Sequence, residues 1–257
     1  MNILAHPDPP GGPLPALRGA FVTGTDTGVG KTVIAGAIAR SLNNAGVRTE
    51  VFKPAASGCR RDRGQLVSED AEFLAACADS SRTLEEIAPL RYAAALAPNV
   101  AAERAGRKVD VEAIFEAYRQ LEGASDAVIV EGVGGLMCPI SDDLWVVHLA
   151  MMMALRVVIV ARPDLGTINH TLLTIHAARS AGLQVAGVIV NRYRGDTEGS
   201  DDQIAMLTNP AQIARKGNTQ ILALVPEDSE TSVSNAILGP NVSVAIDQVD
   251  WKKIIST

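Results

Sequence analysis

Short apolar runs of strand length alternate with segments of helical composition along most of this chain. The runs are rich in Val, Ile, Leu and Ala, and they cover residues 20–23, 49–52, 126–130, 156–161, 184–190 and 220–225. Helical patterns lie between them at residues 32–44, 68–78, 110–122, 167–181 and 201–216. Such alternation is typical of βαβ units, in which helices cover both faces of a buried parallel sheet. We therefore expect an α/β fold with a mostly parallel sheet.

The composition fits one domain of this kind. Of the 257 residues, 47% are apolar but only 4% are aromatic, so Ala, Val, Ile and Leu must form most of the core. A chain of this length buries roughly 70–75% of its unfolded surface and needs no disulfide or metal to fold. We predict a single domain over residues 19–257, preceded by a flexible tail over residues 1–18 that does not have the pattern of a signal peptide.

Charge and cysteine usage narrow the possible partners. The formal net charge of −6 argues against a bulk preference for nucleic acid or for anionic membranes. The most apolar stretch, residues 144–161, is interrupted by His148 and Arg156, so we interpret it as a short helix followed by a strand. The three cysteines are widely spaced and form no CxxC pair, which indicates a reduced, cytoplasmic protein without a structural zinc site.

A glycine-rich segment, GTDTGVGKT, occupies residues 24–32 between the first predicted strand and the first predicted helix. This is the context in which a Walker A loop binds phosphates, because backbone N–H groups and the helix N-terminus then point at the anion. Lys31 would contact the β- and γ-phosphates, and the Thr32 hydroxyl would bind Mg²⁺. Thr25 stands where the usual pattern has its first glycine, which lies one position earlier. A glycine-rich turn that binds nothing is the alternative.

Polar residues follow other predicted strands, and the carboxyl ends of parallel strands line one crevice. Lys53 and Ser57 come just after the second strand and would face the same opening as the glycine-rich loop. Glu131 ends the third strand and is followed by three glycines, at the place where P-loop proteins position a carboxylate near Mg²⁺. A solvated lysine and a surface glutamate in a tight turn are the alternatives.

Three further segments have both a structural and a functional interpretation. Ser68 suits a helix N-cap, whereas Asp70 in the following turn could bind the metal if its loop folds over the phosphates. Residues 166–170 (GTINH) open a helix whose free N–H groups could hold a carboxylate, and we interpret His170 as structural. Asn191 ends the fifth strand, and it either reads the edge of a purine or forms a turn.

Taken in order along the chain, these motifs resemble the dethiobiotin synthetase family. The resemblance runs from about residue 20 to residue 226 and rests on the segments GTDTGVGKT, KPAASG, SED, APNVAAERAG, VEGVGG, DLGTINH and VNR. It implies a P-loop NTPase-like fold and a homodimeric enzyme that uses ATP and Mg²⁺. The implied reaction is the cyclo-ligation of 7,8-diaminopelargonate with CO₂ to dethiobiotin, ADP and phosphate, a step of biotin biosynthesis.

The resemblance also implies roles for individual residues. The catalytic positions around the diamine carbamate and the γ-phosphate are Thr27, Lys31, Lys53 and Ser57. The Mg²⁺ positions are Thr32, Asp70 and Glu131. The nucleotide positions are Thr25, Asp26, Thr27, Gly28, Val29, Gly30, Lys31, Thr32, Asn191, which would read adenine, and Pro226. The other substrate positions are Ser57 and, across a dimer interface, Gly166, Thr167, Ile168 and Asn169, which would receive the substrate carboxylate.

Two positions depart from the family pattern near the expected site. Gly28 stands where some members have Glu, and Asn99 stands where a His after the proline is common. Both departures bear on nucleotide or substrate detail rather than on the class of reaction.

Three other functions are compatible with a P-loop. A ParA/MinD-like ATPase switch, which binds a protein partner, carries a signature Lys five residues before the P-loop Lys, where this chain has Asp26. A ligase related to the cobyrinate diamide synthases usually carries a glutamine amidotransferase domain with a catalytic Cys, and no Cys here has such a setting. A non-catalytic nucleotide-binding module would not consume ATP in response to the diamine.

Overall fold

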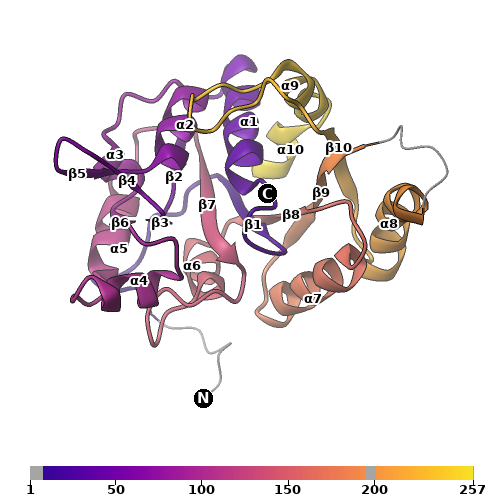
Figure 1. Ribbon diagram of the computed structural model, residues 1–257. Helices are drawn as coiled ribbons and strands as arrows, with labels where there is room; N and C mark the ends of the chain where they lie inside the picture. Colours follow the sequence, from indigo (N-terminus) through magenta and orange to yellow (C-terminus); the bar gives the residue numbers. More distant parts are fainter. Residues whose placement is uncertain (1–7, 195–200, 257) are drawn as a thin grey trace.

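The computed structural model describes residues 8–194 and 201–256, and its centre is a parallel sheet with helices on both faces (Figure 1). The strands of this sheet, from edge to edge, are β10 (Ile221–Pro226), β9 (Val185–Tyr193), β8 (Arg156–Ala161), β1 (Gly19–Gly24), β7 (Ala127–Gly135) and β2 (Thr49–Phe52). Every run that we predicted as a strand belongs to this sheet. The α/β class with a mostly parallel sheet is therefore confirmed.

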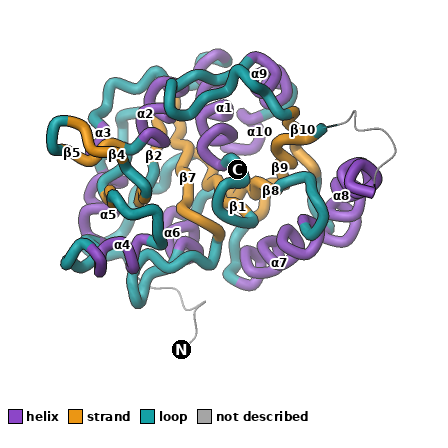
Figure 2. Tube along the Cα trace, viewed as in Figure 1, coloured by secondary structure: helices purple, strands orange, loops and turns teal. Residues whose placement is uncertain are grey.

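Two apolar cores lie on opposite sides of the sheet, and the trace coloured by secondary structure shows the strands between the helices (Figure 2). The helices on one side are α1 (Lys31–Asn44), α2 (Glu69–Ala78), α3 (Leu84–Ile87), α9 (Pro240–Asp247) and α10 (Trp251–Ile255). Those on the other side are α4 (Pro98–Arg104), α5 (Val111–Arg119), α6 (Val146–Met153), α7 (Thr167–Ser180) and α8 (Asp201–Gly217). None of the helices within the described residues is long and apolar enough to cross a membrane.

Two small sheets were not predicted, because their strands are too short to show an apolar period. Their strands are β3 (Ala55–Ser57) with β6 (Leu90–Tyr92), which are parallel, and β4 (Arg60–Asp62) with β5 (Gln65–Val67), which are antiparallel. The first pair lies just beyond β2. It therefore continues the chain from the main sheet toward the residues that were predicted to form a site.

Alternation along the strands decides which side chains face α1. In β7, Val130 belongs to the core beneath α5 and α6, whereas Ile129 belongs to the core beneath α1. Glu131 therefore points to the α1 face. In β2, Phe52 points to the opposite core, so Lys53, the next residue, also turns to the α1 face. The same periodicity thus brings the buried carboxylate of Glu131 and the buried ammonium of Lys53 to one side of the sheet.

Strand β7 is longer than predicted, so the prediction that Glu131 ends the strand was wrong. It pairs with β1 through Val22 opposite Glu131 and, after a register shift, through Gly24 opposite Gly135. Glycine has low intrinsic strand propensity, but the neighbouring strand supplies the ladder that keeps these glycines in the sheet, although Gly134 has a left-handed φ of 61°. The glycines after Glu131 are therefore part of the sheet and not a tight turn.

Part of the predicted N-terminal tail lies against α5. The guanidinium of Arg119 donates hydrogen bonds to the carbonyl oxygens of Pro10, at 2.5 Å, and Gly12, at 2.7 Å. Residues 1–7 lie outside the described residues. The division of the chain into a tail over residues 1–18 and a single following domain stays a prediction.

The segment after β10, which the sequence analysis left open, folds back over α1 by means of α9 and α10. The N-cap of α9 is a glycine without a side-chain cap. Asp228 supplies that cap from a distance, because its Oδ2 accepts the N–H of Asn241 at 2.9 Å. Its Oδ1 accepts the N–H of Glu230, also at 2.9 Å. One carboxylate thus joins the end of β10 to the start of the C-terminal helices.

Replacing Asp228 with alanine is expected to lower the free energy of unfolding by about 1 kcal/mol, because the first turn of α9 loses its acceptor. Chemical denaturation monitored by circular dichroism measures the change. Glu230→Ala is a matched control, since it removes a carboxylate from the same exposed loop but no cap. Equal stability of Asp228→Ala and the unmodified protein would show that the cap contributes nothing.

Candidate active site

The glycine-rich segment joins β1 to α1, as predicted, with residues 25–30 as the loop between them. Gly28, with φ 77°, and Gly30, with φ 94°, have left-handed backbone conformations that glycine adopts without strain. Gly30 is also the N-cap of α1 and offers no side-chain acceptor, so the first N–H groups of this helix remain available to an anion. A Cβ on Gly30 would lie 2.0 Å from Nδ2 of Asn191, which leaves room only for glycine there.

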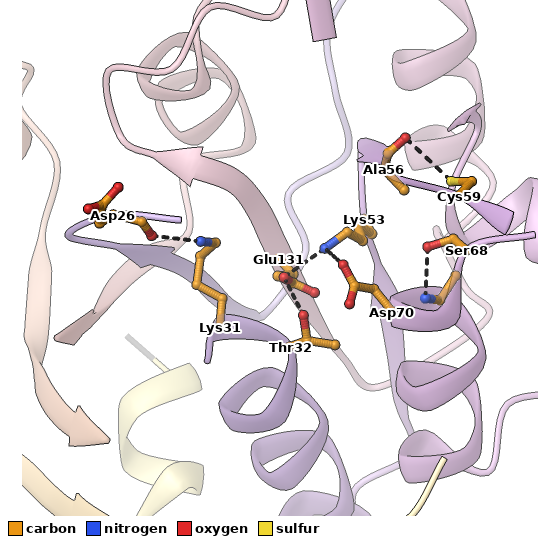
Figure 3. A network of polar contacts seen from close by, with 10 residues as sticks. Asp26, Lys31, Thr32, Lys53, Ala56, Cys59, Ser68, Asp70 and Glu131 are labelled. Carbon is orange, nitrogen blue, oxygen red and sulfur yellow. Dashed lines mark hydrogen bonds and ion pairs between the residues drawn. The ribbon is translucent and has the colours of Figure 1, made fainter. Parts of the chain in front are cut away.

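Lys31 is buried at the start of α1 and bends back over its own loop. Its Nζ donates a hydrogen bond to the backbone carbonyl oxygen of Asp26 at 3.0 Å (Figure 3). Burial lowers the pKa of this ammonium, while the negative charge of Glu131 acts in the opposite direction. A cation held this way, at the mouth of a glycine-rich loop, suits contact with phosphate oxygens.

A buried cluster of charges lies beside the loop. Nζ of Lys53 is 2.7 Å from Oδ2 of Asp70 and 2.7 Å from Oε1 of Glu131. The Thr32 hydroxyl donates a hydrogen bond to the same Oε1 at 2.9 Å (Figure 3). Lys53 is 4% exposed and Glu131 is 1% exposed, whereas Asp70 lies at the edge of the cluster. The structure thus brings together four residues that the sequence placed in separate motifs.

The three ionisable groups of this cluster influence one another strongly. Burial opposes the charge of Lys53, but the carboxylates of Glu131 and Asp70 outweigh it and raise the pKa of the ammonium. Burial of Asp70 is likewise outweighed by Lys53, which lowers the pKa of that carboxyl. Glu131 is buried more completely, and its pKa is raised despite the attraction of Lys53. One ammonium therefore contacts two carboxylates and offsets the charge of one of them.

The oxygen atoms of the cluster fit a divalent metal. Thr32, Asp70 and Glu131 offer a hydroxyl and two carboxylates from three different elements, and Mg²⁺ prefers such hard oxygen donors. The second oxygen of Glu131, Oε2, is buried and has no hydrogen-bond partner within the described part of the chain. A buried acceptor of this kind normally has a partner. The set is too small to hold the metal alone, and the remaining ligands would be phosphates and water.

Two cavities flank the loop. One of about 290 Å³ is lined by the loop residues 26–29 and by residues at the carboxyl ends of three strands: Arg162, Pro163, Asp164, Asn191, Arg192, Arg194 and Glu227. The other, of about 330 Å³, is lined by residues 24–26, residues 135–138 and one side of α7: His170, Leu173, Thr174 and Ala177. The loop therefore separates a more polar space from a more apolar one.

Asn191 lies beneath the loop at the first cavity. It is buried, and its Nδ2 donates a hydrogen bond to the carbonyl oxygen of Val29 at 2.9 Å. Pro226 ends β10 close by in the sheet, because its neighbour Val225 pairs with Asn191. These two positions lie on the same side of the loop, as a nucleotide site would require.

The remaining predicted residues are more dispersed. Ser57 is half-buried at the end of β3, and Thr27 is exposed on the outer part of the loop. In the helix α7, Gly166 is the N-cap with φ 91° and Thr167 is buried, whereas Asn169 is exposed. Ile168 packs against the core. Within one chain, residues 166–169 line neither cavity.

The structure shows the contacts of a capping serine and of two histidines named in the sequence. Ser68 is the N-cap of α2, since its Oγ accepts the N–H of Ala71 at 3.2 Å. Asp70 faces Lys53, and its role as a metal ligand stays a prediction. His148 is structural, because its Nδ1 accepts the N–H of Trp145 at 3.1 Å. His170 was interpreted as structural, but it lies at the rim of the second cavity.

Sequence comparison identifies the family. The family described as an AAA domain matches residues 18–234. The ATP-dependent dethiobiotin synthetase BioD of Anaeromyxobacter sp. (strain K) is 41% identical over 87% of this chain and 96% of its own length. The enzyme of the same name from Bacillus subtilis (strain 168) is 38% identical over 82% of this chain and 88% of its own length. The chain belongs to the dethiobiotin synthetase family.

Solved structures that resemble this member of the dethiobiotin synthetase family show its P-loop fold. The septum site-determining protein MinD from Pyrococcus horikoshii, a complex with Mg-ADP, superposes with a TM-score of 0.52 at 16% identity, over 90% of this chain and 93% of its own. A ParA family ATPase from Chlorobium tepidum gives 0.54 at 14% identity, over 91% and 98%. At such low identity the likeness concerns the fold alone.

Sequence reasoning missed several residues around the first cavity of this dethiobiotin synthetase family member. Arg162 and Glu227 each follow a strand of the parallel sheet, and Arg194 follows β9. Arg194 is paired with Glu227 at 3.5 Å, whereas Nε of Arg162 is buried without a hydrogen-bond partner among the described residues. Position after a parallel strand was the signal that identified Lys53, and it would have identified these residues too.

Proposed function

We propose that this protein closes a cyclic urea on 7,8-diaminopelargonate with CO₂ and ATP, giving dethiobiotin, ADP and phosphate. The observation that carries the proposal is the cluster of Lys53, Asp70, Glu131 and Thr32 next to the loop that bears Lys31. It occurs in a chain that is 41% identical to a protein named ATP-dependent dethiobiotin synthetase. A phosphate loop, two buried lysines and a set of hard oxygen donors are what the chemistry of a phosphorylated carbamate requires.

The reaction needs positioning and charge neutralisation more than a dedicated base. One amine of the substrate adds to CO₂ and becomes a carbamate. The γ-phosphoryl group of ATP passes to a carbamate oxygen and ADP leaves. The second amine then attacks the carbonyl carbon, the carbon–oxygen bond to phosphate breaks, and the five-membered urea closes with loss of protons to water. Each step develops or moves negative charge, which buried cations stabilise.

The roles of individual residues follow from their places in the site. Lys31, which already binds a carbonyl oxygen of its own loop, would move to the β- and γ-phosphates. Lys53 would stabilise the carbamate anion, with Thr27 and Ser57 as hydroxyl donors that orient it. Thr32, Asp70 and Glu131 would hold Mg²⁺, which when bound supplies positive charge to the transferring phosphoryl group.

The more polar cavity suits the nucleoside. It lies between the loop and the carboxyl ends of β8, β9 and β10, with Asn191 at its floor to read adenine and Pro226 near its wall. The backbone of Thr25, Asp26, Gly28, Val29 and Gly30 would surround the phosphates. A Cβ on Gly28 would have no neighbour within 4 Å, so the position where some relatives have Glu is sterically open here.

Arg162→Ala is expected to raise the KM for ATP by about tenfold, because the cavity loses a half-buried guanidinium whose Nε has no partner within the described residues. Steady-state kinetics at varied ATP and saturating diamine measure the change. Arg194→Ala serves as the matched control, since this exposed arginine already pairs with Glu227 and is expected to matter less. An unchanged KM in Arg162→Ala would remove this residue from the nucleotide site.

The more apolar cavity and its surroundings support a homodimer. Leu173 on its rim is 58% exposed, and Leu165, just before α7, is 76% exposed. Large exposed apolar side chains often mark an interface. A second copy covering this face would bring its residues 166–169 to the partner's cavity, where the free N–H groups of α7 could receive the substrate carboxylate.

The proposal of a cytoplasmic location rests on cysteine usage, and Cys59, Cys77 and Cys138 are unpaired.

The deciding experiment is an assay of the purified protein with ATP, Mg²⁺, bicarbonate and 7,8-diaminopelargonate, in which ADP and dethiobiotin are measured together. Equal amounts of both products are expected, and none without the diamine. ADP release that ignores the diamine would favour the ParA/MinD-like switch. The solved structures that resemble this chain include members of that rival class, so the fold is compatible with it. Asp26, however, stands where the rival class has its signature lysine.

A further inference from the structure

Lys53 occupies a place that the proposed function also needs for the metal. Its ammonium lies 2.7 Å from a carboxylate oxygen of Asp70 and 2.7 Å from one of Glu131. These are the two carboxylates assigned to Mg²⁺, and Figure 3 shows the ammonium between them. The ammonium and a divalent cation would therefore be held by the same two carboxylates.

The burial of the cluster makes a cation at this place necessary. Glu131 is 1% exposed and faces Asp70 across Lys53, so two carboxylates would repel each other in a poorly solvated space if Lys53 were absent. Removing one partner of a buried ion pair leaves an uncompensated charge, which destabilises a fold more than the pair itself stabilises it. Lys53 is the cation that meets this requirement in the metal-free chain.

The hydrogen bonds of Glu131 indicate which contacts must change. Its Oε1 accepts from both Lys53 and Thr32, whereas Oε2 has no partner within the described residues. Oε2, which has no partner among the described residues, could bind a metal, and such a metal would lie close to the ammonium that contacts the same carboxylate. Because two cations at such short range repel each other in a poorly solvated space, Lys53 must then release at least one carboxylate, and its long side chain leaves it close to the reacting anion.

We propose that Lys53 is the internal counter-ion of the metal-free protein, which holds Asp70 and Glu131 together and passes to the substrate anion when a divalent cation takes its place. The inference rests on the proposed function for the identity of the metal ligands. In this proposal Lys53 first pairs with the two carboxylates and then, once the metal is bound, with the substrate anion. It also makes the nucleotide-free protein independent of metal for its stability, because the site carries its own cation.

The test is thermal unfolding of the nucleotide-free protein, with EDTA or with Mg²⁺ at millimolar concentration. For Lys53→Met we expect the Tm in EDTA to fall by about 5–10 °C. Mg²⁺ should restore most of this loss, because it replaces the missing cation. For the unmodified protein we expect a change of less than about 1 °C on adding Mg²⁺. Should Lys53→Met fail to fold, Lys53→Gln keeps N–H donors without the charge and tests the same point.

Two further variants show whether the rescue is specific. Lys31→Met removes a neighbouring ammonium that bonds a carbonyl oxygen rather than the carboxylates, and its Tm should respond to Mg²⁺ much less. The double variant Lys53→Met with Glu131→Gln should lose the rescue. An equal response of the unmodified protein and Lys53→Met, or no response in Lys53→Met, would overturn the proposal. Neither nucleotide nor diamine is present, so a failure to form dethiobiotin leaves this result unaffected, and the reverse also holds.

Discussion

Lys53→Ala is expected to lower kcat by about 10²–10³-fold, which is the usual loss when one preorganised donor is removed from a developing negative charge. Lys53 is 4% exposed and lies next to both proposed carboxylate ligands of the metal, so its charge acts at short range in a poorly solvated space. Water that enters the vacated volume cannot reproduce a fixed ammonium. The loss should appear in kcat more than in the KM for ATP, because the lysine acts on the carbamate.

The measurement is steady-state formation of dethiobiotin and ADP at saturating substrates and Mg²⁺, with circular dichroism to show that the variant is folded at the assay temperature. Arg48→Ala is a suitable control, since it removes one cation from an exposed pair with Asp126. These two residues precede β2 and β7, at the ends of the strands away from the site. Exposed pairs of this kind contribute about 0–1 kcal/mol. Near-normal turnover by Lys53→Ala would refute its catalytic role.

Gly30→Ala is expected to weaken ATP binding by at least about 100-fold. Its left-handed φ of 94° already disfavours a side chain, at a cost of about 1–2 kcal/mol. The added Cβ would also meet Nδ2 of Asn191 at 2.0 Å. Either the loop or Asn191 must then move. This movement breaks the hydrogen bond from Asn191 to the carbonyl oxygen of Val29 and changes the shape of the phosphate loop.

Gly28→Ala is the matched control for this variant. Gly28 has a similar φ of 77°, but a Cβ there would meet nothing within 4 Å. It therefore shares the backbone strain and lacks the clash, so we expect a loss of roughly tenfold or less. Calorimetric titration with a non-hydrolysable ATP analogue compares the two variants. Equal losses would mean that strain alone, and not the approach of Asn191, sets the requirement for glycine at position 30.

Much of the fold follows from local patterns. Each strand of the main sheet was visible as an apolar run, because strands buried on both faces carry few polar residues. The loop after β1 was visible because three glycines occur within residues 24–30, between an apolar run and a helical pattern. The C-terminal helices were not visible, since α9 takes its cap from Asp228, thirteen positions before Asn241. The extension of β7 beyond Glu131 depends on pairing with β1, which no window of sequence around it contains.

The sequence by itself determined the α/β class, the place of the phosphate loop and the kinds of residue that follow the strands, because these depend on composition and on periods of two and 3.6 residues. Only the tertiary structure decided which of those residues form ion pairs with one another. The strand alternation turns Glu131 and Lys53 to one face, and the start of α2 brings Asp70 to the same ammonium. Coulomb energies and desolvation depend on distance and burial. Both quantities arise when segments remote in sequence pack together, so a single lysine between two buried carboxylates could be recognised only in the folded chain.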